Sequence, residues 1–316
     1  MKILLTGAFG NLGLSALQHL LSRQHDIRCL ELKTRRNEFV AKQFADQIDL
    51  VWGDLRDAEV VKTAVSQQDI ILHLAAIIPP ASEKQPDLTQ SVNEIGTRNL
   101  VQAAQAQNNP PHFLLASTYD LFGHTHHLPP PRKTADPIAI TSHYTRSKKA
   151  AEEIVQASGL AWSIFRFGSI IQIALGQFPE MAFELPIDQR LHIIHTQDAG
   201  LAVANAVGNQ AIWGKILLIA GGADCQVQYG AFVNGMMEAV GIGALPADAF
   251  TTDYYTTDWL DTEESQRLLA YQRFGFADIR QQTADLLGWR RLFMPLVRPF
   301  VRRWFLSKSP YWHKKS

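Results

Sequence analysis

Three glycines at intervals of three residues, Gly7, Gly10 and Gly13, stand between the first apolar run of the chain and its first helical pattern. Residues 3–5 are apolar, as in a buried strand, and residues 12–21 carry leucines at helical spacing. The first glycine permits a sharp turn, the second lets the backbone approach a pyrophosphate, and the third allows the helix to pack closely on the strand. The free N–H groups at the start of such a helix face the bound anion. The pattern therefore predicts a dinucleotide-binding unit rather than a plain turn.

Strand-like runs and helical patterns alternate along most of the chain. We expect strands at 27–32, 48–52, 70–74, 113–116, 163–167 and 216–220, and helices at 59–65, 92–106 and 144–157. This alternation predicts an α/β fold, a doubly wound parallel sheet of the Rossmann type with a smaller C-terminal substrate-binding lobe. The expected divisions are a Rossmann domain at 1–168 with a return segment at 191–220, a lobe at 169–190 and 221–289, and a basic amphipathic tail at 290–316.

Composition narrows the class of protein. Apolar residues make up 46% of the 316 residues, and 30 Lys and Arg balance 30 Asp and Glu, so no net charge points to nucleic acid. With only Cys29 and Cys225, the chain has neither a disulfide scaffold nor a cysteine-rich zinc site. A single disulfide between these two cysteines is the alternative to reduced thiols. Reduced thiols, the early Gly7 and the lack of a run of 18 apolar residues predict a cytoplasmic protein without signal peptide or membrane span.

Glu31 ends the second expected strand, 18 residues after Gly13. A carboxylate at this point accepts hydrogen bonds from the adenosine ribose hydroxyls and repels a 2′-phosphate, which predicts NAD as the cofactor. Lys33, Arg35 and Arg36 follow directly and offer charges for a 2′-phosphate, so NADP stays the alternative. Glu31 could also be an ordinary solvated acid at a strand end.

Tyr144 and Lys148 form a Tyr-x-x-x-Lys motif at the start of an expected helix, where a spacing of four places both side chains on one face. A free tyrosine has a pKa of about 10. To act as a base near neutral pH, its phenolate must be stabilised by about 4 kcal/mol relative to the phenol. A neighbouring ammonium and a nicotinamide cation both act in that direction. Ser117 and Thr118 end the strand-like run 113–116, which places hydroxyls at the same edge of a parallel sheet.

Further motifs follow in a fixed order: Gly53-Asp54-Leu55, His73-Leu74-Ala75-Ala76, Asn93-Glu94-x-Gly96-Thr97, Ser117-Thr118-x-x-x-Phe122-Gly123 and His195-x-x-Asp198. Together with the glycine loop and the Tyr-Lys pair, they resemble the extended short-chain dehydrogenase/reductases, often called NAD-dependent epimerase/dehydratases. The ordered match covers roughly residues 3 to 220 and is highly specific. Residues 258–272 look like a diverged version of the family's late Asp-x-Ser-Lys…Leu-Gly segment.

The resemblance implies roles by position. Tyr144 would be the acid/base, Thr118 would orient the substrate, and Lys148 would bind the nicotinamide ribose and lower the pKa of the tyrosine. Asp54 would hydrogen-bond to the adenine amino group and Leu55 would flank the ring, unless Asp54 merely caps the following helix. The residues implied in cofactor binding are Gly7, Phe9, Gly10, Asn11, Leu12, Gly13, Glu31, Asp54, Leu55, Leu74, Ala75, Ala76, Ser117, Tyr144 and Lys148. Asn93 either belongs to the site or satisfies buried backbone groups.

The expected activity is hydride transfer between nicotinamide and a secondary alcohol or ketone, with a nucleotide sugar as one version of the substrate. A carbonyl reductase or hydroxysteroid-type dehydrogenase is the alternative, and a non-catalytic NAD(P)-sensing protein is the rival from another class. Two segments depart from the family pattern. After Arg166 the family usually has Asn-Val-Tyr-Gly-Pro, whereas this chain has Phe167-Gly168-Ser169-Ile170-Ile171. Directly after Thr118, Tyr119-Asp120 replaces the family's small polar pair. Family resemblance alone also implies a homodimer through the helices at 92–106 and 144–157.

Two segments allow further interpretations. His124, His126 and His127 cluster in a Pro-rich loop, but without Cys or carboxylates at ligand spacing no metal site is expected. Residues 290–316 contain eight Lys or Arg and no Asp or Glu, beside apolar residues at helical spacing. We favour packing of this tail on its own domain over peripheral contact with an anionic membrane or a partner. Pro295 and Pro299 argue against one long straight helix.

Overall fold

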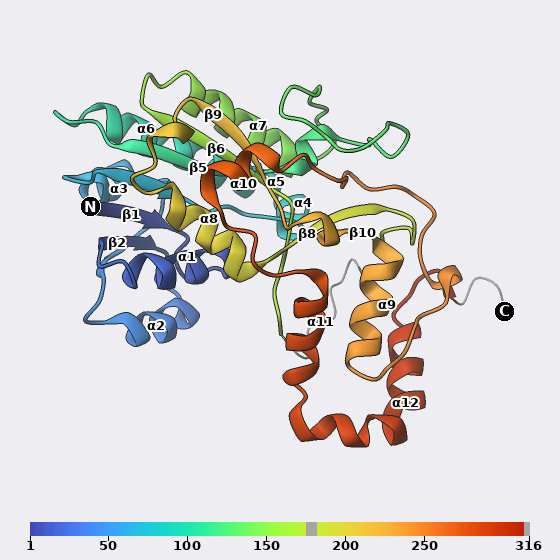
Figure 1. Ribbon diagram of the computed structural model, residues 1–316. Coiled ribbons are helices and arrows are strands. Elements are labelled where there is room, and N and C mark those ends of the chain that lie inside the picture. The colour runs from blue at the N-terminus through green and yellow to red at the C-terminus, as the bar shows by residue number, and fades with distance from the viewer. Residues whose placement is uncertain (175–181, 313–316) are drawn as a thin grey trace.

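Seven strands form one parallel sheet in the order β3-β2-β1-β4-β5-β6-β9 in the computed structural model, which describes residues 1–174 and 182–312 (Figure 1). The strands are β1 (Lys2–Thr6), β2 (Asp26–Glu31), β3 (Asp49–Trp52), β4 (Ile70–His73), β5 (His112–Thr118), β6 (Trp162–Phe167) and β9 (Lys215–Ile219). The strand order reverses between β1 and β4, where doubly wound sheets bind their ligands. The predicted doubly wound α/β fold is confirmed, and each strand-like run of the sequence lies in this sheet.

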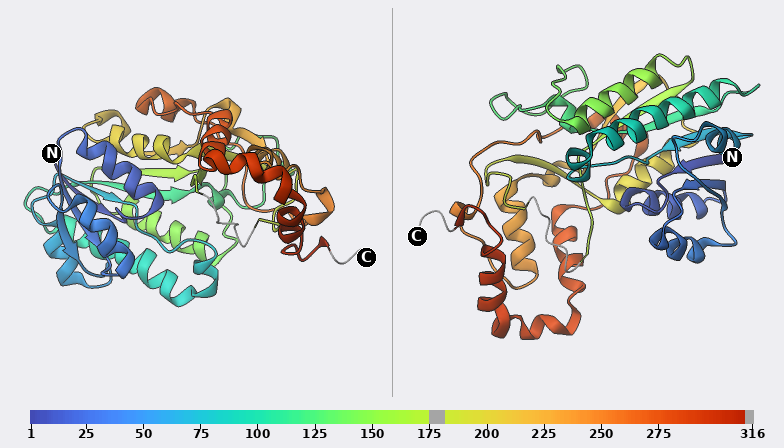
Figure 2. Two further views of the ribbon diagram at one scale, coloured as in Figure 1. Left: turned by 90° about the horizontal axis from the view of Figure 1, so that it is seen from below. Right: turned by 180° about the vertical axis from the view of Figure 1, so that it is seen from behind.

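Helices cover both faces of the sheet, as Figure 2 shows from two sides. On one face α1 (Asn11–Leu21) and α8 (Thr196–Ala206) pack together, and Gly200 is required there because a Cβ would lie 2.1 Å from the Ser15 hydroxyl. The other face carries α3 (Ala58–Val65), α6 (Gly96–Gln105) and α7 (His143–Gln156). Buried aliphatic side chains fill both layers, because strands covered on both sides need apolar residues at every position.

A smaller lobe follows the sixth strand of the sheet. Its three-stranded sheet joins β7 (Ser169–Ile171), β8 (Arg190–His195) and β10 (Gln226–Gln228), so of the predicted return segment 191–220 only β9 enters the main sheet. The lobe also contains α9 (Tyr229–Ala239), α11 (Phe276–Asp285) and α12 (Met294–Leu306), which surround an apolar core of their own. In Figure 1 these helices lie below the main sheet.

The remaining elements are short. They are α2 (Arg35–Ala41), α4 (Ala81–Lys84), α5 (Pro86–Gln90), α10 (Glu263–Leu269), a π-helical turn at Ser91–Ile95, and 3-10 turns that include Tyr119–Phe122 and Gly288–Phe293. Cys29 and Cys225 are both buried free thiols. Within the described residues, no helix combines the length and the apolar character needed to cross a membrane.

The C-terminal tail differs from the expected arrangement. The helix α12 begins at Met294 and accommodates both Pro295 and Pro299 within its first half. Leu306 packs into the core of the lobe, as expected for a docked tail. Tyr311 and Trp312 also pack against this core. Five large apolar side chains among the described residues of the segment are exposed, however: Phe293, Leu296, Val297, Phe300 and Trp304.

Candidate active site

A cavity of about 560 Å³ opens where the carboxyl ends of the central strands face the small lobe. Eleven of the predicted site residues line it: Gly7, Gly10, Asn11, Leu12, Gly13, Leu74, Ala76, Ser117, Thr118, Tyr144 and Lys148. Phe9, Glu31, Asp54, Leu55 and Ala75 are not among its lining residues. The cavity therefore brings the glycine loop and the Tyr-Lys pair together, although about 130 residues separate them in the sequence.

The glycine loop leaves the start of α1 open toward this cavity. Gly7 adopts φ +73°, and an added Cβ would lie 2.7 Å from the backbone nitrogen of Ala75. A Cβ on Gly13 would lie 1.9 Å from the carbonyl oxygen of Gly7, so the helix packs against the loop as the sequence predicts. Gly10 is the N-cap of α1, and no side chain caps the first N–H groups of the helix. These uncapped donors and the positive end of the helix form a site suited to a phosphate.

Glu31 is tied to the glycine loop rather than free in solvent. Its carboxylate accepts hydrogen bonds from the backbone nitrogen of Phe9 (3.1 Å) and the side-chain amide of Asn37 (3.2 Å). Burial raises the pKa of Glu31, opposed by the N–H groups of Phe9 and Ala8 and by the charge of Arg36. The Phe9 ring is fully buried against Trp52, so its contribution to the loop comes from its backbone.

Three more residues predicted to bind the cofactor have structural contacts. Asp54 forms an ion pair with Arg56 (2.6 Å), and the helix that follows is capped by Asp57 instead. Leu55 is buried below α6, where an added Cβ on Gly96 would meet it at 2.9 Å. The Ala75 nitrogen donates to the Thr6 hydroxyl (3.3 Å), which fixes the end of β4 beside β1.

Tyr144 lies in the first turn of α7, which begins at a capping box formed by Ser142 and Thr145. The Glu83 carboxylate accepts hydrogen bonds from the backbone nitrogens of His143 and Tyr144, so the positive end of the helix is occupied by an acid. The side chain of Tyr144 is buried, and it lines the cavity together with Thr118, whose hydroxyl acts to lower the pKa of the phenol. The three residues predicted to be catalytic, Thr118, Tyr144 and Lys148, thus line one cavity.

Burial dominates the ionisation of this pair. It raises the pKa of the Tyr144 phenol, the charge of Asp120 raises it further, and the Thr118 hydrogen bond opposes both. Burial also lowers the pKa of the Lys148 ammonium to about 8, opposed by the Glu152 carboxylate. The protein alone therefore does not lower the pKa of Tyr144, because desolvation outweighs the effect of the Thr118 hydroxyl. The expected lowering by Lys148 together with a nicotinamide cation stays a prediction.

Asp120 is the acid that the sequence analysis noted only as a departure from the family pattern. It lines the cavity, and its Oδ1 atom is buried without a hydrogen-bond partner. Burial raises the pKa of this carboxyl to about 7, opposed by the hydroxyls of Thr118 and Thr256. A carboxyl group of this kind changes charge near neutral pH. Its position directly after the strand-end hydroxyls was the available signal, but its burial follows from the fold and is not visible in the sequence.

The neighbouring polar residues hold the frame of the site. The Ser117 hydroxyl donates to Glu152 (2.6 Å), and Glu152 forms a buried ion pair with Arg166 (2.7 Å). The Asn93 amide bonds to both backbone groups of Ile77 and to the Ser147 hydroxyl, which joins the loop after β4 to α7. Asn93 therefore satisfies buried groups, in line with the structural alternative considered for it.

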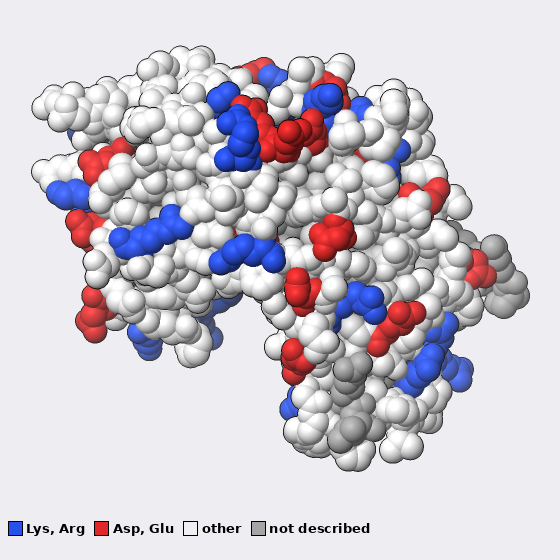
Figure 3. Space-filling model, in the orientation of Figure 1, with Lys and Arg blue, Asp and Glu red and all other residues white. Residues whose placement is uncertain are grey.

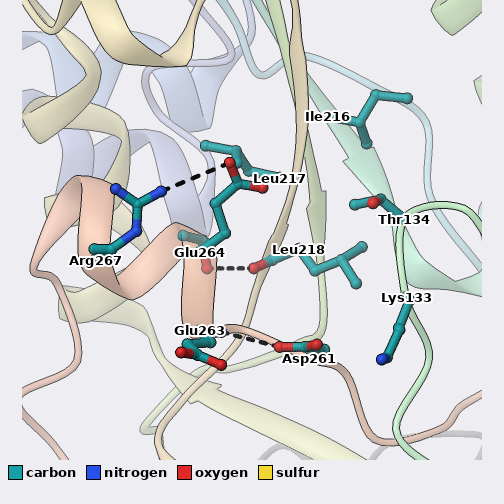
Figure 4. Close-up of a pocket in the computed structure, with 10 residues that line it drawn as sticks. Lys133, Thr134, Ile216, Leu217, Leu218, Asp261, Glu263, Glu264 and Arg267 are labelled. Carbon is teal, nitrogen blue, oxygen red and sulfur yellow. Dashed lines mark hydrogen bonds and ion pairs between the residues drawn. The ribbon is translucent and has the colours of Figure 1, made fainter.

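A second, smaller hollow lies away from the predicted residues (Figure 4). It has a volume of about 320 Å³ and lies between β9 and α10. Its polar groups already contact one another: Glu264 approaches Arg267 (3.9 Å), and the Ser265 hydroxyl donates to the Leu218 carbonyl (2.6 Å). No group of three His, Cys, Asp or Glu side chains in residues 1–174 and 182–312 is arranged to hold a metal ion.

Comparison with known proteins agrees with this geometry. The sequence model of the NAD dependent epimerase/dehydratase family matches residues 3–178, which is more than half of the chain. The protein therefore belongs to the NAD-dependent epimerase/dehydratase family, a family of enzymes, and the predicted resemblance is confirmed.

Individual relatives are more distant. The chain is 30% identical over 165 residues to dTDP-glucose 4,6-dehydratase of Mycolicibacterium smegmatis, which covers 50% of this chain and 48% of the relative. It is 34% identical over 109 residues to 3-beta-hydroxysteroid dehydrogenase of Mycolicibacterium neoaurum, covering 33% of this chain and 28% of the relative. The matches span about half the length of the curated relatives, or less.

Solved structures extend the similarity over nearly the whole fold. UDP-glucuronic acid 4-epimerase from Bacillus cereus, solved in complex with NAD, superposes with a TM-score of 0.77 at 18% sequence identity. The superposition covers 92% of this chain and all of the epimerase chain. At this identity the match establishes a common fold that includes the small lobe.

Proposed function

We propose that the protein is an NAD-dependent oxidoreductase that acts on an apolar secondary alcohol or ketone, with Tyr144 as the acid/base. The observation that carries this proposal is the single cavity in which the uncapped start of α1 and the Thr118–Tyr144–Lys148 group face each other. The NAD bound by the similar epimerase structure supports the choice of cofactor.

The residues present fit a dinucleotide. The open N–H groups after Gly10 suit the pyrophosphate, and the Glu31 carboxylate at the end of β2 suits the adenosine ribose. When bound, nicotinamide supplies hydride transfer to or from the carbon that carries the substrate oxygen. Lys148 would bind the nicotinamide ribose. The positively charged ring of oxidised nicotinamide would then lie near the Tyr144 phenol.

Tyr144 would exchange a proton with the substrate oxygen, and Thr118 would hold that oxygen by a hydrogen bond. In the oxidative direction the phenolate removes the hydroxyl proton, and in the reductive direction the phenol donates it. Because the protein alone raises the pKa of Tyr144, we infer that the phenol ionises only when additional positive charge lies nearby. Protonation of Asp120, whose pKa is about 7, removes the negative charge that opposes this ionisation.

The substrate side of the cavity favours an apolar molecule. Its walls carry Ile78, Ile170, Ile171, Leu185, Leu191, Tyr229, Phe232 and Tyr255. Lys148 is the one Lys or Arg among the described lining residues, and residues 175–181 contain neither in their sequence. A second phosphate-bearing molecule is usually held by positive side chains, and the described lining offers none on this side. The similarity to a 3-beta-hydroxysteroid dehydrogenase supports the same choice.

A nucleotide sugar is the second candidate, favoured by the similarity to dTDP-glucose 4,6-dehydratase and UDP-glucuronic acid 4-epimerase. The same Tyr144 chemistry would serve it, with the hydride returned to the product instead of leaving as reduced cofactor. The two candidates therefore differ in substrate and net reaction rather than in the acid/base residue.

The test is a substrate survey with the purified protein and NAD⁺ or NADH. One panel holds apolar cyclic secondary alcohols and ketones, the other nucleotide diphosphate sugars, and both are followed by nicotinamide absorbance and by mass spectrometry. We expect turnover of the apolar panel with a net change in nicotinamide absorbance. Turnover of sugars alone would replace the first candidate by the second. Binding of NAD(H) without turnover of either panel would contradict an enzymatic role on both substrate classes.

A further inference from the structure

The C-terminal helix α12 presents an apolar face to solvent. Leu296, Phe300 and Trp304 follow one another at intervals of four and form a stripe along the helix, with 73%, 76% and 52% of their surfaces exposed. The exposed apolar side chains continue at both sides of this stripe and into the preceding 3-10 turn, with Trp289, Phe293 and Val297. We call this set the α12 face. Several large apolar side chains exposed side by side on a soluble protein mark an interaction surface.

The opposite side of α12 is fixed to the lobe by its arginines. The Arg298 Nε atom donates to the Ile242 carbonyl at 3.0 Å, and Arg302 donates to the carbonyls of Gly243 and Ala244. Leu306 is buried in the lobe core. Rotation of the helix to bury the α12 face would break these contacts, so the apolar side chains stay outside. The tail thus has the reverse of the orientation that simple docking of an amphipathic helix predicts.

Positive charge accompanies the α12 face. Arg303 is an exposed neighbour of Trp304, and the Lys308 ammonium lies 5.4 Å from the centre of the Trp304 ring. Residues 290–316 contain eight Lys or Arg and no Asp or Glu. In Figure 3, Lys and Arg side chains lie over the position of α12.

We propose that the α12 face docks on the surface of an anionic lipid bilayer. Apolar side chains with tryptophans between them, flanked by Lys and Arg, match the boundary between acyl chains and negatively charged headgroups. Each basic residue near such a surface adds to the affinity, and a helix of this kind lies in the plane of the interface without crossing it. A second copy of the chain fits less well, because two α12 faces would bring like charges together. This proposal does not depend on the proposed oxidoreductase function.

The experiment is cosedimentation of the full chain with vesicles of phosphatidylcholine mixed with phosphatidylglycerol, and with vesicles of phosphatidylcholine alone. We expect binding to the anionic vesicles that weakens as salt rises, because the headgroup attraction is screened. Phe300→Asp should lower the partition coefficient about tenfold or more, since it replaces a large apolar side chain that would enter the bilayer by a charge. Replacing Arg303 and Lys308 by Glu should weaken binding to anionic vesicles about fivefold or more per residue.

The matched control is Phe39→Asp, because Phe39 is 69% exposed on α2, far from the tail in sequence. It should bind vesicles like the unaltered protein. Melting temperature and NAD(H) binding are measured for every variant, so that loss of vesicle binding is separated from loss of the fold. The proposal is overturned if the unaltered protein does not sediment with anionic vesicles at low salt. It is equally overturned if Phe300→Asp binds as well as Phe39→Asp, or if Phe300→Asp converts a dimer into a monomer without changing vesicle binding.

Discussion

Asp120 and Tyr144 line the same cavity, close enough that the charge of the Asp120 carboxylate acts on the Tyr144 phenol. Burial raises the pKa of each group, and the Asp120 charge raises that of the phenol further. The protonation state of Asp120 therefore affects how readily Tyr144 gives up its proton.

Asp120→Asn tests this coupling through activity. Above pH 7 the variant lacks the negative charge that the unaltered protein carries beside the phenol. The pH profile of the oxidative reaction should therefore shift to lower pH in the variant. An unchanged profile would show that the carboxylate does not act on Tyr144.

The same variant has a predictable stability profile. The pKa of Asp120 is about 7 in the fold and 3.8 as the ordinary value, so the folded state holds its proton more tightly. Ionisation in the folded state thus costs stability that is absent below pH 4, grows from pH 4 to 7 and is complete above pH 7. Asp120→Asn removes this cost, up to about 4 kcal/mol. Thermal unfolding at pH 5 and pH 8 should show the larger gain for the variant at pH 8.

Lys148→Met should separate function from stability. The pKa of Lys148 is lowered to about 8 by burial, so its charge is costly below pH 8 and the cost is relieved between pH 8 and 10.5. The variant should unfold at the same or a higher temperature at pH 7, while turnover falls by a factor of about 10² or more. Lys149→Met is the control, because Lys149 lies on the surface and pairs with Glu153. A clear loss of stability in Lys148→Met would contradict the account of its burial.

Glu31→Gln tests the choice of cofactor. Glutamine keeps an acceptor for the Phe9 nitrogen but removes the negative charge that would repel a 2′-phosphate. We expect the preference for NAD(H) over NADP(H), measured by calorimetry, to fall about tenfold, which corresponds to ~1.4 kcal/mol. Tighter binding of NADP(H) by the unaltered protein would refute the proposed role of Glu31 and point to Lys33, Arg35 and Arg36.

Glu152→Gln is expected to lower the free energy of unfolding. Glu152 and Arg166 are both almost fully buried, so the variant leaves the guanidinium without its counter-ion. Breaking a buried pair in this way costs about 3–5 kcal/mol. Glu153→Gln, one residue along on the surface, should cost less than about 1 kcal/mol. Chemical denaturation measures both, and similar losses would argue against a buried ion pair.

The sequence alone predicts the parts of this structure that depend on local pattern. The glycine loop, the parallel strands and the Tyr144–Lys148 spacing are all fixed by residues close together in the chain, and the structure has them where they are expected. The homodimer and the boundaries of the domains stay predictions.

Features that depend on distant contacts were not predictable in this way. Asp120 becomes a group with a pKa near 7 because the folded chain buries it, which its position in the sequence does not reveal. The apolar side of α12 faces outward because Arg298 and Arg302 find carbonyl partners after α9, and no periodicity reveals which side of an amphipathic helix packs inward. Desolvation of Tyr144, which raises the pKa of its phenol, likewise depends on the whole fold.

Tyr144→Phe tests the central claim most directly, once a substrate is known. The variant keeps the buried ring and loses only the phenol oxygen, so NAD(H) binding by calorimetry should stay near that of the unaltered protein. Tyr254→Phe, which removes an exposed phenol outside the cavity, is the control and should keep full activity. We predict that turnover by Tyr144→Phe falls by a factor of about 10²–10⁴. Near-normal turnover with intact cofactor binding would contradict the account and require another acid/base.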